Sequence, residues 1–150
     1  MNCIKTDANH QDFKSLVILL DKYLHQIDGD EHSFYAQFNK IDFIKHVVIC
    51  YDADTPIGCG AIKEYIKGVY EVKRMFVVED YRGKGVASII LKELENWTTE
   101  LGFTKCVLET GKKQESAIKL YQKNGYKLIP NYGQYVGILN SVCMEKDLNK

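Results

Sequence analysis

The sequence of 150 residues predicts an α/β (α+β) fold, in which a mixed, mainly antiparallel twisted sheet is flanked by helices. Three apolar runs with strand-like alternation follow one another between residues 46 and 78, and tight turns separate them, as in an antiparallel meander. An amphipathic helical pattern over 87–101 then leads into another apolar run at 105–110. A helical connection of this length joins parallel strands, so we expect a central parallel pair linked by a crossover helix.

Length and composition fit one domain over residues 1–150, because 45% hydrophobic residues supply a sizeable core. Lys plus Arg equals Asp plus Glu, at 20 each, so no overall field favours nucleic acid or an anionic membrane as a partner. The amino terminus has no apolar signal core, and no apolar run approaches membrane-spanning length. We therefore expect a cytoplasmic protein with neither membrane nor nucleic-acid partners.

The cysteines and histidines indicate no metal site. The five cysteines are odd in number, lack C-x-x-C spacing and lie mostly in apolar runs, which is typical of buried free thiols in a reducing compartment. The four histidines show neither metal-ligand nor triad spacing. The cysteines are Cys3, Cys50, Cys59, Cys106 and Cys143.

The amino-terminal half is expected to contain a first strand, a helix and the meander. Six apolar residues recur at helical spacing and stop before Gly29, which predicts an amphipathic helix. The segment SFYAQFNKIDF is a candidate for a shorter second helix, and the three meander strands are HVVICYD, IGCGAIKEY and VYEVKRMFVV. The helical stripe consists of Phe13, Leu16, Val17, Leu20, Leu24 and Ile27.

The carboxy-terminal half predicts two helices and two strands. The stripe of the 87–101 helix runs from Ala87 to Leu101, and Gly102 supplies its stop. KCVLET is then expected as a strand, QESAIKLYQKNG as a helix ending at Gly125, and SVCMEKDL as the last strand after the loop PNYGQYVG.

The stretch VVEDYRGKGVAS joins the meander to the crossover helix and places Gly83 and Gly85 around a lysine. A helix start leaves backbone N–H groups unpaired at the positive end of the dipole, and glycines permit the positive φ at which such groups converge on a phosphate. The alternative is a solvated basic turn that starts a helix. Spacing excludes both the Walker pattern and G-x-G-x-x-G, so a P-loop NTPase and a dinucleotide dehydrogenase are disfavoured.

Two motifs resemble the GCN5-related N-acetyltransferase (GNAT) family. RMFVVEDYRGKGVASIILKELENW is similar to its coenzyme A site, where the family's Gln/Arg, Gly and Gly/Ala positions are met by Arg82, Gly85 and Ala87. QESAIKLYQKNGYKLI resembles the second signature of the family, and the likeness runs from Gly58 to Leu148. The resemblance thus implies a GNAT-like sheet and acetyl-CoA as co-substrate.

In the family, the pyrophosphate lies on N–H groups at the start of the crossover helix, and the pantetheine runs beside the preceding strand as an added strand. A main-chain N–H near Val77 would stabilise the oxyanion. Gln114 stands where many relatives have a coenzyme-contacting asparagine, and its alternative role is an ordinary helix start. The implied cofactor-binding residues are Met75, Phe76, Val77, Arg82, Gly83, Lys84, Gly85, Val86, Ala87, Ser88 and Gln114.

The resemblance also implies the catalytic residues. Tyr121 matches the tyrosine that protonates the leaving thiolate, and its alternative is a core tyrosine with a satisfied hydroxyl. Glu71 is the leading candidate for the base that deprotonates the incoming ammonium, and its alternative is a surface carboxylate on an alternating strand. Glu109 is the rival candidate for the base, and a water chain could replace either. Glu71 lies an even number of steps from Val77, so both side chains should face one side of the strand unless a bulge intervenes.

We therefore expect an N-acetyltransferase that acetylates a primary amine of a small molecule or peptide in a ternary complex; an acyl group larger than acetyl stays open. The segments DGDEHSFYAQF and PNYGQYVG would bound the acceptor groove, where acidic groups suit a cationic amine but also fit a solvated surface. The alternative is a non-catalytic module that binds acetyl-CoA as a sensor or interaction partner. The oligomeric state, including a homodimer, stays open.

Overall fold

The computed structural model describes residues 1–28 and 44–149, which form a single mixed sheet with helices on both faces. The strands lie in the order β1-β2-β3-β4-β5-β7-β6. Their bounds are β1 (Asn2–Thr6), β2 (His46–Asp52), β3 (Thr55–Ile66), β4 (Val69–Val77), β5 (Lys105–Gly111), β6 (Lys127–Ile129) and β7 (Ser141–Asp147). The α-helices are α1 (Gln11–Asp28), α3 (Val86–Glu100) and α4 (Glu115–Lys123), and two 3-10 helices are η2 (Glu79–Tyr81) and η3 (Gly133–Tyr135).

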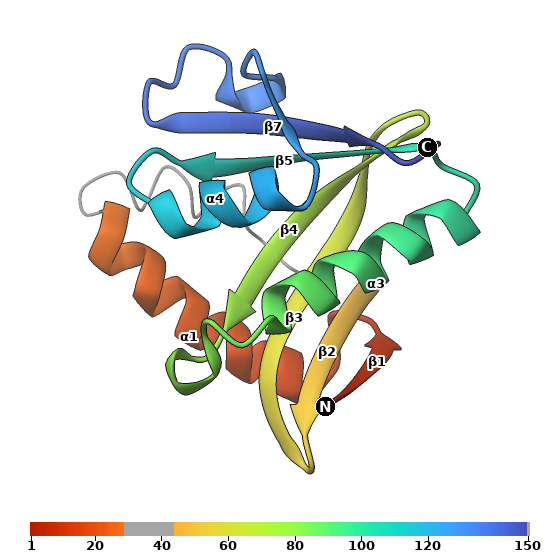
Figure 1. Ribbon diagram of the computed structural model, residues 1–150, viewed down its shortest axis with the longest axis vertical. Helices are drawn as coiled ribbons and strands as arrows, with labels where there is room; N and C mark the ends of the chain where they lie inside the picture. Colours follow the sequence, from red (N-terminus) through yellow and green to blue (C-terminus); the bar gives the residue numbers. More distant parts are fainter. Residues whose placement is uncertain (29–43, 150) are drawn as a thin grey trace.

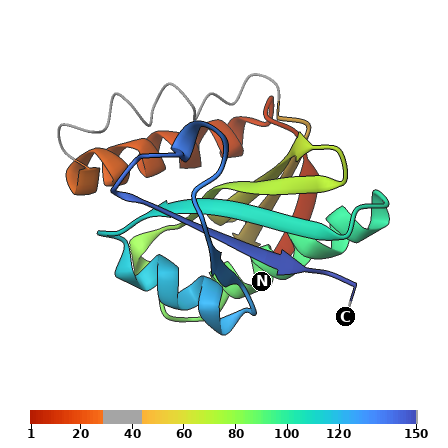
Figure 2. The same ribbon diagram turned by 90° about the horizontal axis from the view of Figure 1, so that it is seen from above.

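The helices cover the sheet in two outer layers, with α1 on one face and α3 and α4 on the other (Figure 2). On the α1 face, Phe13 and Leu16 are buried against Val47 and other strand residues. On the opposite face, Ile90, Leu91 and Leu94 of the predicted stripe of α3 have no exposed surface. Ala87 and Trp97 are partly buried, and Leu101, which follows the helix, is exposed. The apolar periods of both helices are therefore explained by the two cores that they form with the sheet.

The predicted meander is confirmed, because β2, β3 and β4 pair antiparallel in sequence order. β4 carries a β-bulge, since Cys59 pairs with Phe76 and Ala61 pairs with Lys73, so three steps along β4 match two along β3. Arg74 lies in this bulge with a φ of +57°.

The bulge breaks the alternation of side chains along β4. Val72 and Val77 both join the core on the α3 face, whereas Arg74 reaches Asp21 on α1. Glu71, next to Val72, consequently faces the α1 side. The shared side expected of Glu71 and Val77 applies only to a strand without a bulge, and the extra residue of this bulge places the two side chains on opposite sides.

The expected parallel pair, β4 and β5, is present but short. The two strands pair from Val69–Glu71 to 105–107 and then separate toward their carboxyl ends (Figure 1). β5 continues its antiparallel pairing with β7 up to Gly111, and β4 continues its antiparallel pairing with β3 up to Val77, so the sheet opens between β4 and β5 at this point. The edge of β4 beyond Glu71 therefore has no partner strand on its β5 side within the described residues.

Two parts of the sequence interpretation differ from the structure or lie outside it. The three-residue strand β6, in the segment YKLI, was not predicted, because a strand this short shows no alternation. The loop PNYGQYVG contains the single turn η3. The candidate second helix at 33–43 lies outside the described residues, as does most of DGDEHSFYAQF.

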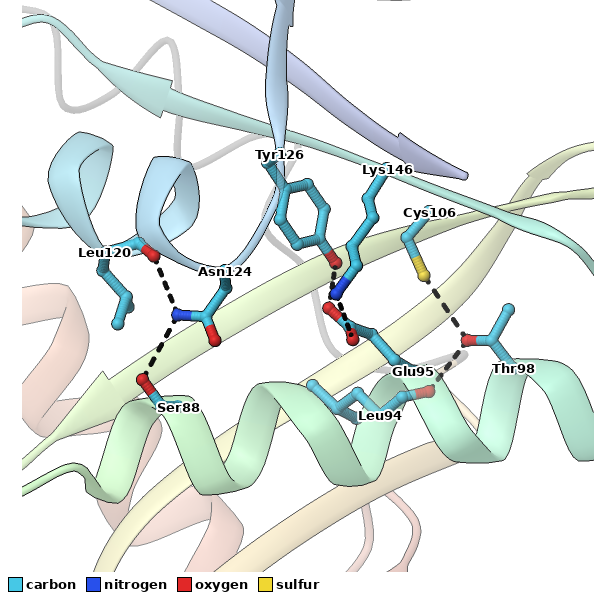
Figure 3. Close-up of polar contacts among 9 residues, drawn as sticks. All are labelled: Ser88, Leu94, Glu95, Thr98, Cys106, Leu120, Asn124, Tyr126 and Lys146. Carbon is cyan, nitrogen blue, oxygen red and sulfur yellow. Dashed lines mark hydrogen bonds and ion pairs between the residues drawn. The ribbon is translucent and has the colours of Figure 1, made fainter. Parts of the chain in front are cut away.

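A network of polar contacts fixes α4 and β7 against α3 (Figure 3). Glu95 on α3 is only 4% exposed, and it accepts hydrogen bonds from the Tyr126 hydroxyl at 3.0 Å and from Lys146 Nζ at 2.8 Å. Asn124, at the end of α4, donates to Ser88 Oγ near the start of α3 at 3.2 Å. These contacts hold the end of α4 over the first turn of α3, beside the glycine loop.

The structure confirms the cysteines as free thiols, four of them buried, while Cys3 is partly exposed. Burial raises the pKa of Cys59 to about 12 and the pKa of Cys106 and Cys143 to about 11. These three thiols therefore stay protonated at neutral pH and are poor nucleophiles. No helix within residues 1–28 and 44–149 is both long and apolar enough to span a membrane.

Candidate active site

The glycine loop presents open backbone at the start of α3. Gly83 and Gly85 have φ values of +76° and +82°, and a Cβ added to either would meet no heavy atom within 4 Å. Ile89 is the first residue of this region whose N–H is used, donating to Gly85 O at 3.1 Å. No described residue accepts a hydrogen bond from the N–H groups of residues 83–88. A row of unpaired donors at the positive end of a 15-residue helix suits a phosphate.

Arg82 turns back onto β4 instead of extending along the loop. Its Nε donates to the carbonyl oxygen of Val77 at 2.9 Å, and its guanidinium lies 4.8 Å from the ring centre of Tyr23 on α1 and 5.5 Å from that of Phe76. Cation–π contacts of this kind hold the charge close to the loop. Arg82 therefore connects the loop to the end of β4. Its positive charge would attract an anionic ligand electrostatically, without a direct hydrogen bond. Lys84 is exposed, with Nζ 5.3 Å from the ring centre of Tyr81.

A groove of about 480 Å³ runs from the glycine loop, past the free edge of β4, to the inner face of α4. At one end it is lined by Gly83 and Gly85, and at the other by Ala117 and Tyr121. Lys84 is the one predicted cofactor-binding residue that does not line it. The predicted residues that do are Met75, Phe76, Val77, Arg82, Gly83, Gly85, Val86, Ala87, Ser88 and Gln114.

A smaller cavity of about 90 Å³ adjoins the groove and contains the predicted acid–base groups. Glu71 from β4, Glu109 from β5 and Tyr121 from α4 all line it. Four residues line both spaces and form the boundary between them: Leu20, Met75, Gln114 and Tyr121. Three residues far apart in the sequence thus meet where β4 and β5 separate.

Tyr121 lies at this boundary with a side chain that is available to a ligand. The residue is 7% exposed, and its ring packs edge to face against Tyr126 at a centroid distance of 5.9 Å. Its hydroxyl makes no hydrogen bond to any described residue, in contrast to the core tyrosine with a satisfied hydroxyl that was the alternative. Burial, followed by the charge of Glu109, raises the pKa of Tyr121 above its ordinary value. The hydroxyl is therefore protonated throughout the neutral range.

Glu71 is buried, at 7% exposure, so its alternative interpretation as a surface carboxylate is wrong. The Tyr132 hydroxyl donates to Glu71 Oε2 at 2.5 Å, and Lys73 Nζ lies 3.5 Å from Oε1. Burial, and next the charge of Glu71, raises the pKa of Tyr132, so this hydroxyl remains a donor. The sequence indicates Tyr132 only as part of a loop beside the acceptor groove, because no local pattern indicates a contact 61 residues away.

Glu109 and Gln114 complete the site. Glu109 is half-buried, and Ser141 Oγ donates to its Oε2 at 2.8 Å. Gln114 is the N-cap residue of α4, but its side chain makes no capping hydrogen bond. The Gln114 amide therefore lines both spaces without serving the helix, which favours a ligand contact over a role as an ordinary helix start.

Comparisons with known proteins agree with this geometry. A family model described as the acetyltransferase (GNAT) family matches residues 13–126. An IAA acetyltransferase of Azospirillum brasilense is 39% identical over 95 residues, which cover 63% of this chain and 62% of the relative. The matched part therefore spans about three fifths of that relative's length.

Solved structures share the fold over almost the whole chain. A predicted acyl-CoA N-acyltransferase from Klebsiella pneumoniae superposes with a TM-score of 0.82 at 26% identity, covering 98% of this chain and 97% of that one. A PaiA N-acetyltransferase from Thermoplasma acidophilum, solved in complex with coenzyme A, gives a TM-score of 0.71 at 18% identity and covers 98% and 99%.

Proposed function

Because the chain belongs to the GNAT family of acetyltransferases, we propose that it transfers an acetyl group from acetyl-CoA to a primary amine of a small molecule or peptide. The observation that carries this proposal is the continuity of the site. One groove leads from the unpaired donors at Gly83 and Gly85 to Tyr121, and Tyr121 also lines the cavity that holds Glu71 and Glu109. The groove thus connects the loop suited to a phosphate with the cavity that contains the candidate acid and base.

Acetyl-CoA would bind along this groove as a substrate. Its pyrophosphate would accept hydrogen bonds from the N–H groups of residues 83–88, and its pantetheine would lie along the free edge of β4 as an added strand. The N–H of Val78 donates to Ile57 O, so alternation points the Val77 N–H away from β3, toward this free edge. The Val77 N–H is therefore suited to hold the oxygen of the thioester as it becomes an oxyanion.

The reaction needs a base for the acceptor ammonium and an acid for the departing thiolate, besides the attack itself. Glu71 would take a proton from the ammonium of the acceptor, with Glu109 or a water chain as the alternative base. The neutral amine nitrogen then attacks the thioester carbonyl carbon, the carbon–sulfur bond breaks, and the departing thiolate takes the proton of the Tyr121 hydroxyl. The second proton of the attacking nitrogen then passes, directly or through water, to the tyrosinate, which leaves a neutral amide and restores Tyr121. The place of Tyr121 at the boundary between the groove and the cavity supports this role. Its raised pKa keeps the hydroxyl protonated until the thiolate leaves, and it also makes the hydroxyl a weaker acid.

A non-catalytic module that binds acetyl-CoA as a sensor is the alternative. Such a module needs the glycine loop, but it has no use for a buried Glu71 held by Tyr132 or for a Tyr121 hydroxyl without a partner among the described residues. Burying a carboxylate costs desolvation free energy even when it is hydrogen-bonded, so the presence of Glu71 beside Tyr121 at the end of the groove favours catalysis.

The proposal is tested by incubating the protein with acetyl-CoA and a panel of amines, and measuring the release of free coenzyme thiol. We expect amine-dependent release and an acetylated amine of matching amount by mass spectrometry. Tight binding of acetyl-CoA in calorimetry, with no amine-dependent release across small amines, amino acids, polyamines and peptides, would instead support the sensor.

A further inference from the structure

Arg74 lines the small cavity beside Glu71, yet the proposed reaction does not use it. Its side chain is 2% exposed, and Nη2 donates to Asp21 Oδ1 on α1 at 2.7 Å. Nε and Nη1 are shielded from water and donate to no acceptor in residues 1–28 or 44–149. A buried cation with unpaired donors is unfavourable by itself, so this guanidinium indicates a further acceptor besides the described residues, which a bound ligand can supply.

The backbone of Arg74 is also unfavourable. Its φ of +57° lies in the left-handed region, which is uncommon for residues other than glycine, asparagine and aspartate. The bulge that imposes this conformation turns Arg74 to the α1 side of β4, which is the side that Glu71 faces. Arg74 thus has unpaired donors and an unfavourable backbone at a position that lines the cavity, and together these features point to a function in binding.

The cavity therefore combines two carboxylates with two cations. Glu71 and Glu109 suit an ammonium, and Lys73 and Arg74 suit an anion; Lys73 already lies near Glu71 at 3.5 Å. A diamine would bring a second positive charge toward Arg74. A simple alkylamine would leave the guanidinium unpaired. An acceptor that carries both an amine and a carboxylate satisfies both ends, and a cavity of about 90 Å³ limits this part of the acceptor to a small group.

We propose that the acceptor is a small zwitterionic amino acid, whose amine lies toward Glu71 and Glu109 and whose carboxylate accepts hydrogen bonds from Arg74. This inference rests on the proposed N-acetyltransferase function and names its substrate class. The Asp21 carboxylate already accepts from Nη2, so a carboxylate fits against this guanidinium. Because Asp21 is half exposed, water competes for its ion pair, and a bound carboxylate can add to that contact or replace it.

The test compares free amino acids with their amides as acceptors, at equal concentrations of the neutral amine. For the wild type, we expect kcat/KM to be higher for the acid than for the amide. Arg74→Gln should lower the ratio of acid to amide by about 10- to 100-fold, the effect of losing a charge-assisted hydrogen bond. Arg74→Lys, which keeps the charge with fewer donors, should lower it less.

Asp21→Asn is the matched control, because it breaks the Arg74–Asp21 ion pair and leaves Arg74 in place. It should keep the ratio of acid to amide at or above the wild-type value. If Arg74 only anchors α1, then Arg74→Gln and Asp21→Asn would lower the melting temperature together and leave the ratio unchanged, which would overturn the inference. If Arg74→Gln does not fold, the inference is tested by the acid-to-amide ratio of kcat/KM in the wild type and in Arg74→Lys. A wild-type ratio at or below one would overturn it.

The inference and the proposed function fail in different ways. If amines are acetylated but amides serve as well as acids, the function stands and the inference is wrong. If no amine is acetylated, calorimetry of the wild-type protein with an amino acid and with its amide still tests the site. A preference for the acid that Arg74→Gln removes would support the inference, and equal binding or none would overturn it.

Discussion

Tyr121 and Tyr126 are neighbouring rings whose hydroxyls have different surroundings. The Tyr121 hydroxyl has no described partner, whereas the Tyr126 hydroxyl donates to the buried Glu95. Tyr121→Phe should therefore lower turnover by about 10²–10⁴-fold, the range for one general acid, with little change in acetyl-CoA affinity or melting temperature. Tyr126→Phe should instead cost about 1–3 kcal/mol of unfolding free energy, with turnover per folded molecule nearly unchanged.

Steady-state kinetics and thermal unfolding of the two variants check this prediction. Near-normal turnover in Tyr121→Phe would remove that hydroxyl from the chemistry. The raised pKa of Tyr121 adds a pH criterion, because no alkaline loss of activity through this group should begin below its ordinary pKa of 10.0.

Glu71 and Glu109 line the same cavity and compete for the role of base. If Glu71 takes the proton, Glu71→Gln should remove the acidic limb of the pH–rate profile and regain part of its activity at high pH, where more of the amine is already neutral. Glu109→Gln should keep the limb. An unaltered profile in Glu71→Gln, with the limb lost in Glu109→Gln, would transfer the role to Glu109, and an unaltered profile in both would leave it to water.

Cys106 tests whether the thiols are structural. Cys106→Ala should lower the unfolding free energy by about 1 kcal/mol or more at pH 7 and leave turnover unchanged. Folding raises the pKa of this thiol from 9.0 to about 11, so its protonated form stabilises the native state below pH 9.0, and this contribution is lost as the pH rises toward 11. The stability deficit of the variant should therefore shrink over that interval. A large loss of turnover in stable Cys106→Ala would indicate an acetyl-cysteine step.

At the scale of the element, the strand–loop–helix unit of β4 and α3 forms the proposed phosphate site, and its glycines permit a matched comparison. Gly85 and Gly68 have φ values of +82° and +86°, and both have open space where a Cβ would lie. Gly68 belongs to the turn between β3 and β4, away from the groove. Valine at either position should destabilise the fold by a similar amount, about 1–3 kcal/mol, because both must hold a β-branched residue at positive φ.

Only Gly85→Val should also lose acetyl-CoA binding, since its side chain would occupy the space beside the unpaired N–H groups. Calorimetry with acetyl-CoA on both folded variants measures the difference. Equal affinity in Gly85→Val and Gly68→Val would contradict the assignment of the phosphate site to this loop.

At the scale of the whole molecule, the sequence was sufficient where one local pattern determines one element. The stripe of α3 and the meander are such cases, and Ile90 and Leu94 are buried as their spacing predicts. The bulge at Arg74 was not predictable, because VYEVKRMFVV alternates acceptably with or without an extra residue. Only the structure therefore shows on which side of β4 the Glu71 side chain lies.

The partners of the site residues were also beyond local patterns. The hydrogen bond between Tyr132 and Glu71 depends on how η3 lies relative to β4. The hydrogen bond from Arg82 to the carbonyl of Val77 is accompanied by stacking of the guanidinium on the ring of Tyr23 in α1. Family motifs predicted which residues line the groove, since ten of the eleven expected cofactor-binding residues do so, but not which of their atoms are already engaged.

The central claim is direct transfer of an acetyl group from bound acetyl-CoA to a bound amine. Initial rates measured over a matrix of acetyl-CoA and amine concentrations test it most directly, with the acetylated amine quantified by mass spectrometry. The account predicts double-reciprocal lines that intersect, because both substrates must be bound before the thioester is attacked. Parallel lines, which indicate an acetylated protein as an intermediate, or coenzyme release without acetylated amine, would contradict it.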